Sequence, residues 1–277
     1  MSFLTLLKTS RPRFWIYLLG PALIGMISAL SVNGQWTWAA IGILLVFTFP
    51  ANLFIYGVND VFDQETDRLN PKKQDYEQLL DPKKTRVLFF VIGASLIPFL
   101  GVLLMLPRST SISFLIFIFL GAFYSAPPIR AKAKPFLDAL FNCLYLLPAL
   151  VAWFAFGGGA LHWPLVIAGG AWCMAMHAYS AVPDIAADQA SGIQTIATFL
   201  QKKGTLYFCT VLYLMSARIA SFSIGNIALL FGLVYLVLMF VSLQTKTAEE
   251  LFRVYRFFPW INTLIGMGLF WWILLAK

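Results

Sequence analysis

Charged residues are scarce in this sequence. Only 12% of its 277 residues are Asp, Glu, Lys or Arg, whereas 60% are hydrophobic and the mean hydropathy is +0.79. This shortage of charge excludes an ordinary soluble domain of this length. The chain is therefore predicted to be a polytopic membrane protein that lies in the lipid bilayer.

Cysteine is equally rare, and its placement excludes a cysteine metal centre. Cys143, Cys173 and Cys209 stand singly in apolar segments, without a CxxC pair, and are expected to be packing residues. The net charge of +8 would suggest nucleic acid in a soluble protein. Here the cations lie in short segments between apolar runs, so no nucleic-acid partner is expected.

Nine apolar segments are long enough, or nearly so, to cross a hydrocarbon core of about 30 Å. They lie at residues 14–32, 37–58, 86–106, 111–126, 136–156, 162–181, 205–222, 224–243 and 256–276. We predict an all-α fold of nine transmembrane helices around a central cavity, with residues 1–277 forming a single membrane-embedded domain. Two stretches, about 59–85 and 182–204, are expected to be cap loops on one side of the membrane.

The distribution of charge predicts the orientation. With the N-terminus in the cytoplasm, seventeen of the twenty Lys and Arg residues fall on the cytoplasmic side, and only Arg108, Arg218 and Lys277 do not. All twelve acids also fall on that side, which the orientation rule does not require. We therefore expect an integral protein of the cell membrane, with its N-terminus and its active site facing the cytoplasm.

The second apolar segment ends in a cluster of carboxylates. If this stretch is helical, Asp60, Asp63 and Asp67 lie at i, i+3 and i+7 on one face. Three acids on one stripe repel each other, so a cation, a basic partner or water must relieve the repulsion. Asn52 and Asn59 precede them on the same face and could hold the carboxylates or the waters of a metal.

The sixth apolar segment ends in a second acidic pair. Asp184 and Asp188 are spaced i, i+4, again on one helical face. Because the second and sixth helices are both even-numbered, their C-terminal ends reach the same side of the membrane. Carboxylates suit Mg²⁺, which proteins usually hold with one or two carboxylates plus substrate phosphates. The two clusters fit an amphiphile with a diphosphate head and a hydrocarbon tail.

Basic residues accompany these acids. Arg68, Lys72 and Lys73 follow the first cluster, and Arg130 and Lys132 follow a proline turn between the fourth and fifth helices. Each of these cations could contact a diphosphate. Each is equally open to interpretation as a positive-inside signal.

These motifs together resemble the UbiA superfamily of intramembrane prenyltransferases. The first motif is similar to NDxxDxxxD, with Asn59, Asp60, Asp63 and Asp67, and the second to DxxxDxxxGxxT, with Asp184, Asp188, Gly192 and Thr195. The tyrosine-proline loop at 124–138 is also similar, and the match covers nearly the whole chain. Within the superfamily, the motifs are most similar to the lycopene elongase branch of carotenoid synthesis. Ala186 and Ala187 stand where many members carry a further acid, which removes one possible metal ligand.

The resemblance implies Mg²⁺-dependent transfer of an isoprenyl group from an allylic diphosphate to a lipophilic acceptor in the membrane, with lycopene or a related carotenoid as the candidate acceptor. The implied metal ligands are Asp60, Asp63, Asp67, Asp184 and Asp188. Asn59 and Tyr124 join them in the implied catalytic set. The implied diphosphate-binding residues are Arg68, Lys72, Lys73, Arg130 and Lys132.

Several further roles stay open between chemistry and packing. Tyr56, Tyr124 and Tyr179 either face an allylic cation or pack within the membrane. His177 lies seven residues before Asp184 and is either a base for the acceptor or a satisfied core group.

Asp138 and Asn142 form an i, i+4 pair that a helix cap and anchor would explain as well as catalysis would.

Two other functions compete with this interpretation. Prenylation of an aromatic ring, in quinone or haem synthesis, needs the same donor motifs and a different acceptor pocket. A membrane transporter would also place acids in a polytopic protein. The acids of a transporter, however, are expected along a path through the middle of the membrane, whereas the acids of this chain are predicted to lie at one face of it.

Overall fold

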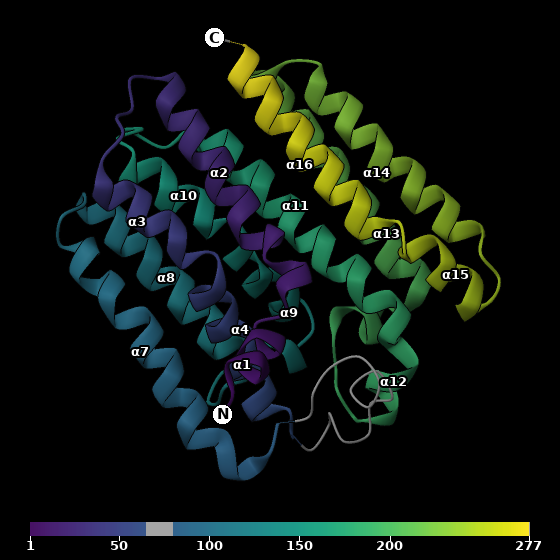
Figure 1. Cartoon of the computed structure of the whole chain (residues 1–277). Coiled ribbons are helices and arrows are strands. Elements are labelled where there is room, and N and C mark those ends of the chain that lie inside the picture. Colours follow the sequence, from purple (N-terminus) through teal and green to yellow (C-terminus); the bar gives the residue numbers. More distant parts are fainter. Residues whose placement is uncertain (65–79, 277) are drawn as a thin grey trace. The chain divides into compact units, whose positions relative to one another are not determined.

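The computed structural model describes residues 1–64 and 80–276, and within them the chain is helical without any strand (Figure 1). Within those residues, nine stretches are long and apolar enough to cross a membrane, which confirms the predicted all-α fold. They lie at Pro12–Ser31, Trp38–Phe62, Pro82–Leu103, Arg108–Ser125, Leu137–Ala155, Trp163–Ala190, Ile196–Ile224, Ile227–Gln244 and Ala248–Leu275.

The chain divides into two compact units, which are described separately. Unit 1 comprises Met1–Arg130, Leu147–Gly159 and Leu269–Lys277, and unit 2 comprises Ala131–Leu146 and Ala160–Gly268. The single domain and the central cavity stay predictions.

Unit 1 contains α1 (Phe3–Thr9), η1 (Pro12–Phe14), α2 (Ile16–Ser31), α3 (Trp38–Val46), α4 (Phe49–Phe62), η2 (Pro82–Lys84), α7 (Thr85–Leu103), α8 (Arg108–Ser125) and α10 (Leu147–Ala155). Unit 2 contains η3 (Ala131–Ala133), α9 (Leu137–Phe141), η4 (Asn142–Tyr145), α11 (Trp163–Ala181), η5 (Val182–Asp184), α12 (Ile185–Ala190), α13 (Ile196–Ile224), α14 (Ile227–Gln244) and α15 (Ala248–Tyr255). Helix α16 (Phe258–Leu275) begins in unit 2 and ends in unit 1.

The seventh span differs most from its predicted bounds, because it begins at Ile196 instead of residue 205. The polar Gln201-Lys202-Lys203 stretch hid its first turns from a hydropathy reading. Thr195 caps this helix, since its hydroxyl accepts a hydrogen bond from the Thr198 N–H at 3.2 Å. Gln201 has non-helical backbone angles, so the first turns are set off from the rest of α13 by a kink.

The second span is broken between α3 and α4. Pro50 lies in the first turn of α4, where a missing N–H costs no hydrogen bond. The fully buried Asn52 donates from Nδ2 to the carbonyls of Phe47 (3.1 Å) and Thr48 (2.6 Å). Asn52 therefore stabilises the break, and the expectation that it holds the carboxylates is wrong.

In unit 1, helix α2 packs closely against α10. A Cβ atom at Gly25 would lie 2.0 Å from the carbonyl oxygen of Ala149, closer than real Cβ contacts occur. Only glycine permits this approach of the two backbones, as is common between membrane helices.

In unit 2, helix α13 packs between α11 and α14, and tyrosines fill the interior. The Tyr213 and Tyr235 rings stack with centroids 4.4 Å apart, and Tyr235 donates its hydroxyl to Asn262 Oδ1 at 2.9 Å. Tyr179 is fully buried, and its hydroxyl lies 2.9 Å from Ser242 Oγ. Tyr179 is therefore a packing residue, and its alternative role beside an allylic cation is not supported.

The close approach at Gly25 predicts a large effect of one added methyl group. Gly25→Ala is expected to lower the free energy of unfolding by about 1–3 kcal/mol, because the backbone of α10 must move. Gly101→Ala in α7 is the matched control, since a Cβ atom there meets no heavy atom within 4 Å. Thermal unfolding of the purified protein in detergent measures both. Equal melting temperatures for the two variants would contradict the packing of α2 on α10.

Candidate functional site

The first carboxylate cluster lies where α4 ends, in unit 1. Asp60 is in the last turn, and Asp63 is the C-cap residue, with its N–H donating to the carbonyl of Asn59 at 3.0 Å. Both side chains are buried, with exposed fractions of 5% for Asp60 and 7% for Asp63. The structure thus brings these two acids together at the end of an apolar helix. The predicted site residues Asp67, Arg68, Lys72 and Lys73 lie outside the described residues.

Asn59 orients the second of these carboxylates. Its Nδ2 group donates to Asp63 Oδ2 at 2.7 Å and to Ser125 Oγ at 3.0 Å. Ser125 is the buried last residue of α8, so the amide connects the ends of two helices. Asn59 therefore contacts one of the carboxylates, that of Asp63, as expected. The sequence contained no signal for Ser125.

Arg11 compensates the charge of the other carboxylate. Its Nη2 lies 2.9 Å from Asp60 Oδ1, with side chains only 15% and 6% exposed. Its guanidinium carbon lies 4.7 Å from the centre of the Tyr56 ring, a cation–π contact. From the sequence, Arg11 is predicted only to be one of the orientation cations, and no sequence pattern indicates this pairing. The Tyr56 ring thus contacts a cation that belongs to the protein itself.

The turn after α8 holds the predicted loop residues of unit 1. Tyr124 is half-buried near the end of α8, and the Pro127–Pro128 bond is cis. Arg130 is exposed, and its N–H donates to the carbonyl of Ala126 at 2.9 Å. Arg130 is accessible from solvent, which suits a contact with a diphosphate as well as a solvated cation.

The second carboxylate cluster lies in unit 2, at the end of the sixth span. Asp184 ends η5 and precedes α12, and Asp188 lies in the first turn of α12. Both are half-buried. Gly192 has φ of +69°, a left-handed conformation that glycine adopts without strain, and Thr195 caps α13. In the second motif the acids are thus half-buried, while the glycine and threonine shape the turn.

Lys132 lies close enough to Asp188 for their charges to interact. Its side chain is buried, and burial lowers its pKa from 10.5 to about 8, although the Asp188 carboxylate acts in the opposite direction. A desolvated lysine binds an oxyanion more strongly than a solvated one, because water competes less for its ammonium group. Unit 2 therefore combines a carboxylate pair with a buried cation.

Asp138 and Asn142 anchor the fifth span, as the cap interpretation proposed. Asp138 Oδ2 accepts a hydrogen bond from the Ile196 N–H at 2.8 Å and lies 3.3 Å from His177 Nε2. Asn142 Nδ2 donates to the carbonyl of Cys173 at 3.4 Å. Both residues thus connect the fifth span to its neighbours in unit 2.

The described part of the chain holds no group of three or more His, Cys, Asp or Glu side chains arranged to bind a metal. It does hold the buried pair Asp60 and Asp63, and the pair Asp184 and Asp188. Two carboxylates with substrate oxygens and water suffice for Mg²⁺, so the donor sets of both clusters fit this ion.

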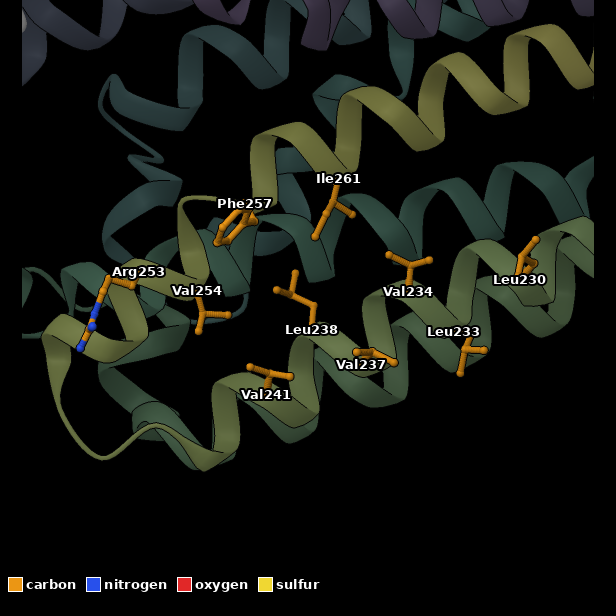
Figure 2. Close-up of a pocket in the computed structure, with 10 residues that line it drawn as sticks. All are labelled: Leu230, Leu233, Val234, Val237, Leu238, Val241, Arg253, Val254, Phe257 and Ile261. Atoms are coloured by element: carbon orange, nitrogen blue, oxygen red, sulfur yellow. The ribbon is translucent and has the colours of Figure 1, made fainter.

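An apolar groove in unit 2 is unsuited to a diphosphate. It has a volume of about 550 Å³ and lies on α14, α15 and α16 (Figure 2). Leucine, valine, isoleucine and phenylalanine side chains line it, and Arg253 at one end is its single charged residue. Without carboxylates this groove is not the predicted site.

The comparisons with known proteins agree with the fold and with the motifs. A model of the UbiA prenyltransferase family matches residues 18–275. The chain belongs to this family. It is therefore a transferase enzyme of the membrane, and the transporter alternative is not supported.

Curated relatives align over nearly the whole chain. A lycopene elongase/hydratase of Haloarcula japonica is 39% identical over 95% of this chain and 88% of its own length. The protein of the same name from Halobacterium salinarum is 40% identical, covering 96% and 95% respectively. A third lycopene elongase/hydratase, from Corynebacterium glutamicum, is 31% identical, covering 94% and 93%.

Solved structures of UbiA homologues share the fold. The homologue from Archaeoglobus fulgidus bound to GPP and Mg²⁺ superposes with a TM-score of 0.73 at 18% identity, over 96% of this chain and 99% of that one. The apo homologue from Aeropyrum pernix K1 gives a TM-score of 0.70 at 17% identity, over 93% and 97%.

The pairing of Arg11 with Asp60 predicts a stability that depends on divalent cations. Arg11→Gln is expected to lower the free energy of unfolding by about 1–3 kcal/mol in EDTA. This is less than for a fully buried pair, because the guanidinium is partly exposed. Excess Mg²⁺ should restore much of the loss, since a second cation can then compensate Asp60. Melting temperatures with EDTA and with Mg²⁺ measure the effect.

Arg13→Gln is the matched control, because Arg13 is exposed two residues away in the same turn. A loss in Arg11→Gln that equals the loss in Arg13→Gln, or that does not respond to Mg²⁺, would contradict this role.

Proposed function

We propose that this enzyme transfers an isoprenyl group from an allylic diphosphate to lycopene or a related carotenoid, in a reaction that depends on Mg²⁺. The observation that carries the proposal is the near full-length identity of up to 40% with proteins named lycopene elongase/hydratase. The carboxylate clusters at the ends of two spans support the donor half of the reaction. The identity with those relatives supports the acceptor half.

The proposed metal ligands are Asp60, Asp63, Asp67, Asp184 and Asp188. When bound there, Mg²⁺ would neutralise the diphosphate and make it a better leaving group. The donor sets support this assignment, because each described pair offers hard oxygen ligands.

In unit 1, the residues around the carboxylates fix their orientation. Asn59 holds Asp63 through a 2.7 Å hydrogen bond, so that carboxylate keeps one oxygen directed at the amide. Arg11 holds Asp60 and lies over Tyr56. Such fixed partners limit the reorganisation that the site undergoes when charge develops on the leaving group.

In unit 2, Lys132 is the strongest candidate for binding the diphosphate. Its ammonium group is buried and near Asp188, so an oxyanion would gain both a charge partner and hydrogen bonds in a water-poor setting. Arg130 is proposed to bind the same group from the adjoining turn. Arg68, Lys72 and Lys73 are assigned this role from the sequence alone.

The reaction then needs protection of the allylic cation that remains when the C–O bond to the diphosphate breaks. Aromatic faces stabilise such cations, and we assign this role to Tyr124, since Arg11 already lies over the Tyr56 ring. A double bond of the acceptor attacks the cation and forms the new C–C bond. Following the positive-inside rule, we place the site on the cytoplasmic side of the cell membrane.

Removing one metal-binding carboxylate should abolish transfer. Asp60→Asn and Asp184→Asn are each expected to lower the rate of diphosphate release at least about 100-fold, because a neutral amide binds Mg²⁺ poorly. In Asp60→Asn the amide also no longer compensates the charge of Arg11. The measurement uses membranes that contain the full chain, Mg²⁺ and dimethylallyl diphosphate. Glu249→Gln, an exposed residue on α15, is the control and should keep the wild-type rate. Full activity in both Asp variants would disprove the assignment of the clusters.

Expression in a lycopene-producing host identifies the acceptor. The pigment is expected to gain one or two five-carbon units by mass, with or without added water. The Asp60→Asn variant in the same host should leave lycopene unchanged. An unchanged pigment together with a prenylated ring compound would instead establish prenylation of an aromatic acceptor.

A further inference from the structure

We propose that His177, positioned by Asp138, is the general base that acts on the carotenoid after the new C–C bond has formed. His177 Nε2 lies 3.3 Å from Asp138 Oδ2 in unit 2, and the two residues are 39 positions apart in the sequence. This inference rests on the proposed function and assigns a residue to its second half. The clusters described above serve the donor, and none of their groups is needed for this step.

Asp138 is held rigidly from a second direction. Its Oδ2 atom also accepts the Ile196 N–H at 2.8 Å, in the first turn of α13, and its side chain is fully buried. The Ile196 N–H lies at the start of α13, where backbone donors lack a partner within the helix, and this contact fixes the orientation of the Asp138 side chain. Asp138 Oδ1 is buried and has no hydrogen-bond partner among the described residues, so Oδ2 alone receives these contacts.

The contact selects one form of the imidazole ring. A carboxylate oxygen only accepts hydrogen bonds, so Nε2 must carry the proton that it shares with Asp138. In the neutral ring, Nδ1 then carries the lone pair and is the basic nitrogen. The contact also fixes the orientation of the ring, so that Nδ1 is held in place to take up a proton.

The position of His177 along the span suits a reaction at the hydrocarbon part of the substrate. His177 precedes Asp184 by seven residues. It therefore lies about 10 Å or more from Asp184 along the span, towards the N-terminus of α11. The diphosphate is proposed to bind at Asp184, and the isoprenyl chain extends from it into the membrane. The His177 side chain is 11% exposed, which leaves part of the ring accessible.

The C–O bond of the donor breaks first and releases diphosphate. The acceptor double bond then attacks C1 of the allylic cation, which forms the C–C bond and leaves a tertiary cation on the acceptor. A water molecule adds to this cation and gives its proton to His177 Nδ1. The products are the elongated alcohol, diphosphate and one proton, which returns to solvent. In the competing path, a neighbouring carbon gives its proton to solvent water and an alkene forms, so a base that activates the attacking water favours the alcohol.

The test separates this step from ionisation of the donor. Membranes with the full chain receive Mg²⁺, dimethylallyl diphosphate and lycopene, and two quantities are measured: diphosphate release, and the ratio of hydrated to unhydrated elongated product by mass. His177→Gln is expected to lower that ratio about 100-fold or more, which is the usual contribution of a general base, while diphosphate is still released. Asp138→Asn should lower it in the same direction, because the amide no longer selects the same protonated form of the ring.

His162→Gln is the matched control. His162 is the other histidine of the chain, is exposed and stands at the opposite end of the same helix, so its replacement should leave both quantities unchanged. Added imidazole should restore part of the hydrated product in His177→Gln and none in the control, a result that a purely structural role of His177 would not give.

A wild-type product ratio in His177→Gln would overturn the inference. So would equal loss of diphosphate release and hydration in a variant whose melting temperature is that of the wild type. Absence of lycopene-dependent diphosphate release in the wild-type enzyme would instead contradict the proposed function.

Discussion

The cost of placing a carboxylate at the edge of an apolar span governs the polar contacts of this protein. An isolated charge in such surroundings is strongly disfavoured, so each buried acid needs a compensating group. Asp60 has Arg11, Asp63 has Asn59, and Asp138 has the N–H of Ile196 together with His177. These contacts hold the ends of the helices together as well as stabilise the acids, and the helix ends therefore have fixed positions within each unit.

The cost of an unpaired polar group also explains why polar side chains lie where a helix breaks or begins. A continuous helix satisfies its own backbone and offers no free groups, whereas a break exposes carbonyls and N–H groups that must be paired inside the membrane. Asn52 pairs the carbonyls at the break between α3 and α4, and Asp138 pairs an N–H at the start of α13. Both polar residues therefore have a structural role that the fold requires, whatever chemistry occurs nearby.

The helices and the carboxylates could be predicted from the sequence, because both depend on residues close together in the chain. Hydropathy located the nine spans, although it missed the first turns of the seventh. The spacing of the acids placed Asp60 with Asp63 and Asp184 with Asp188. The partners could not be predicted, since Arg11 and Asp60 are 49 residues apart and Asn59 and Ser125 are 66 apart. Arg11 stands beside Lys8 and Arg13 before the first apolar segment, as a cation that only sets the membrane orientation would. A pairing of this kind follows only from how helices pack.

The second motif shows why a recognised pattern does not assign roles to its members. Asp184 and Asp188 are the half-buried side chains to which we assign the metal, whereas Gly192 supplies a left-handed turn and Thr195 caps a helix. That helix start presents the Ile196 N–H to Asp138, which in turn contacts His177. Two hydrogen bonds, from Ile196 to Asp138 and between Asp138 and His177, thus connect the turn that ends the motif with the residue that we propose acts on the acceptor. In unit 2 the start of α13, Asp138 and His177 therefore form one hydrogen-bonded network.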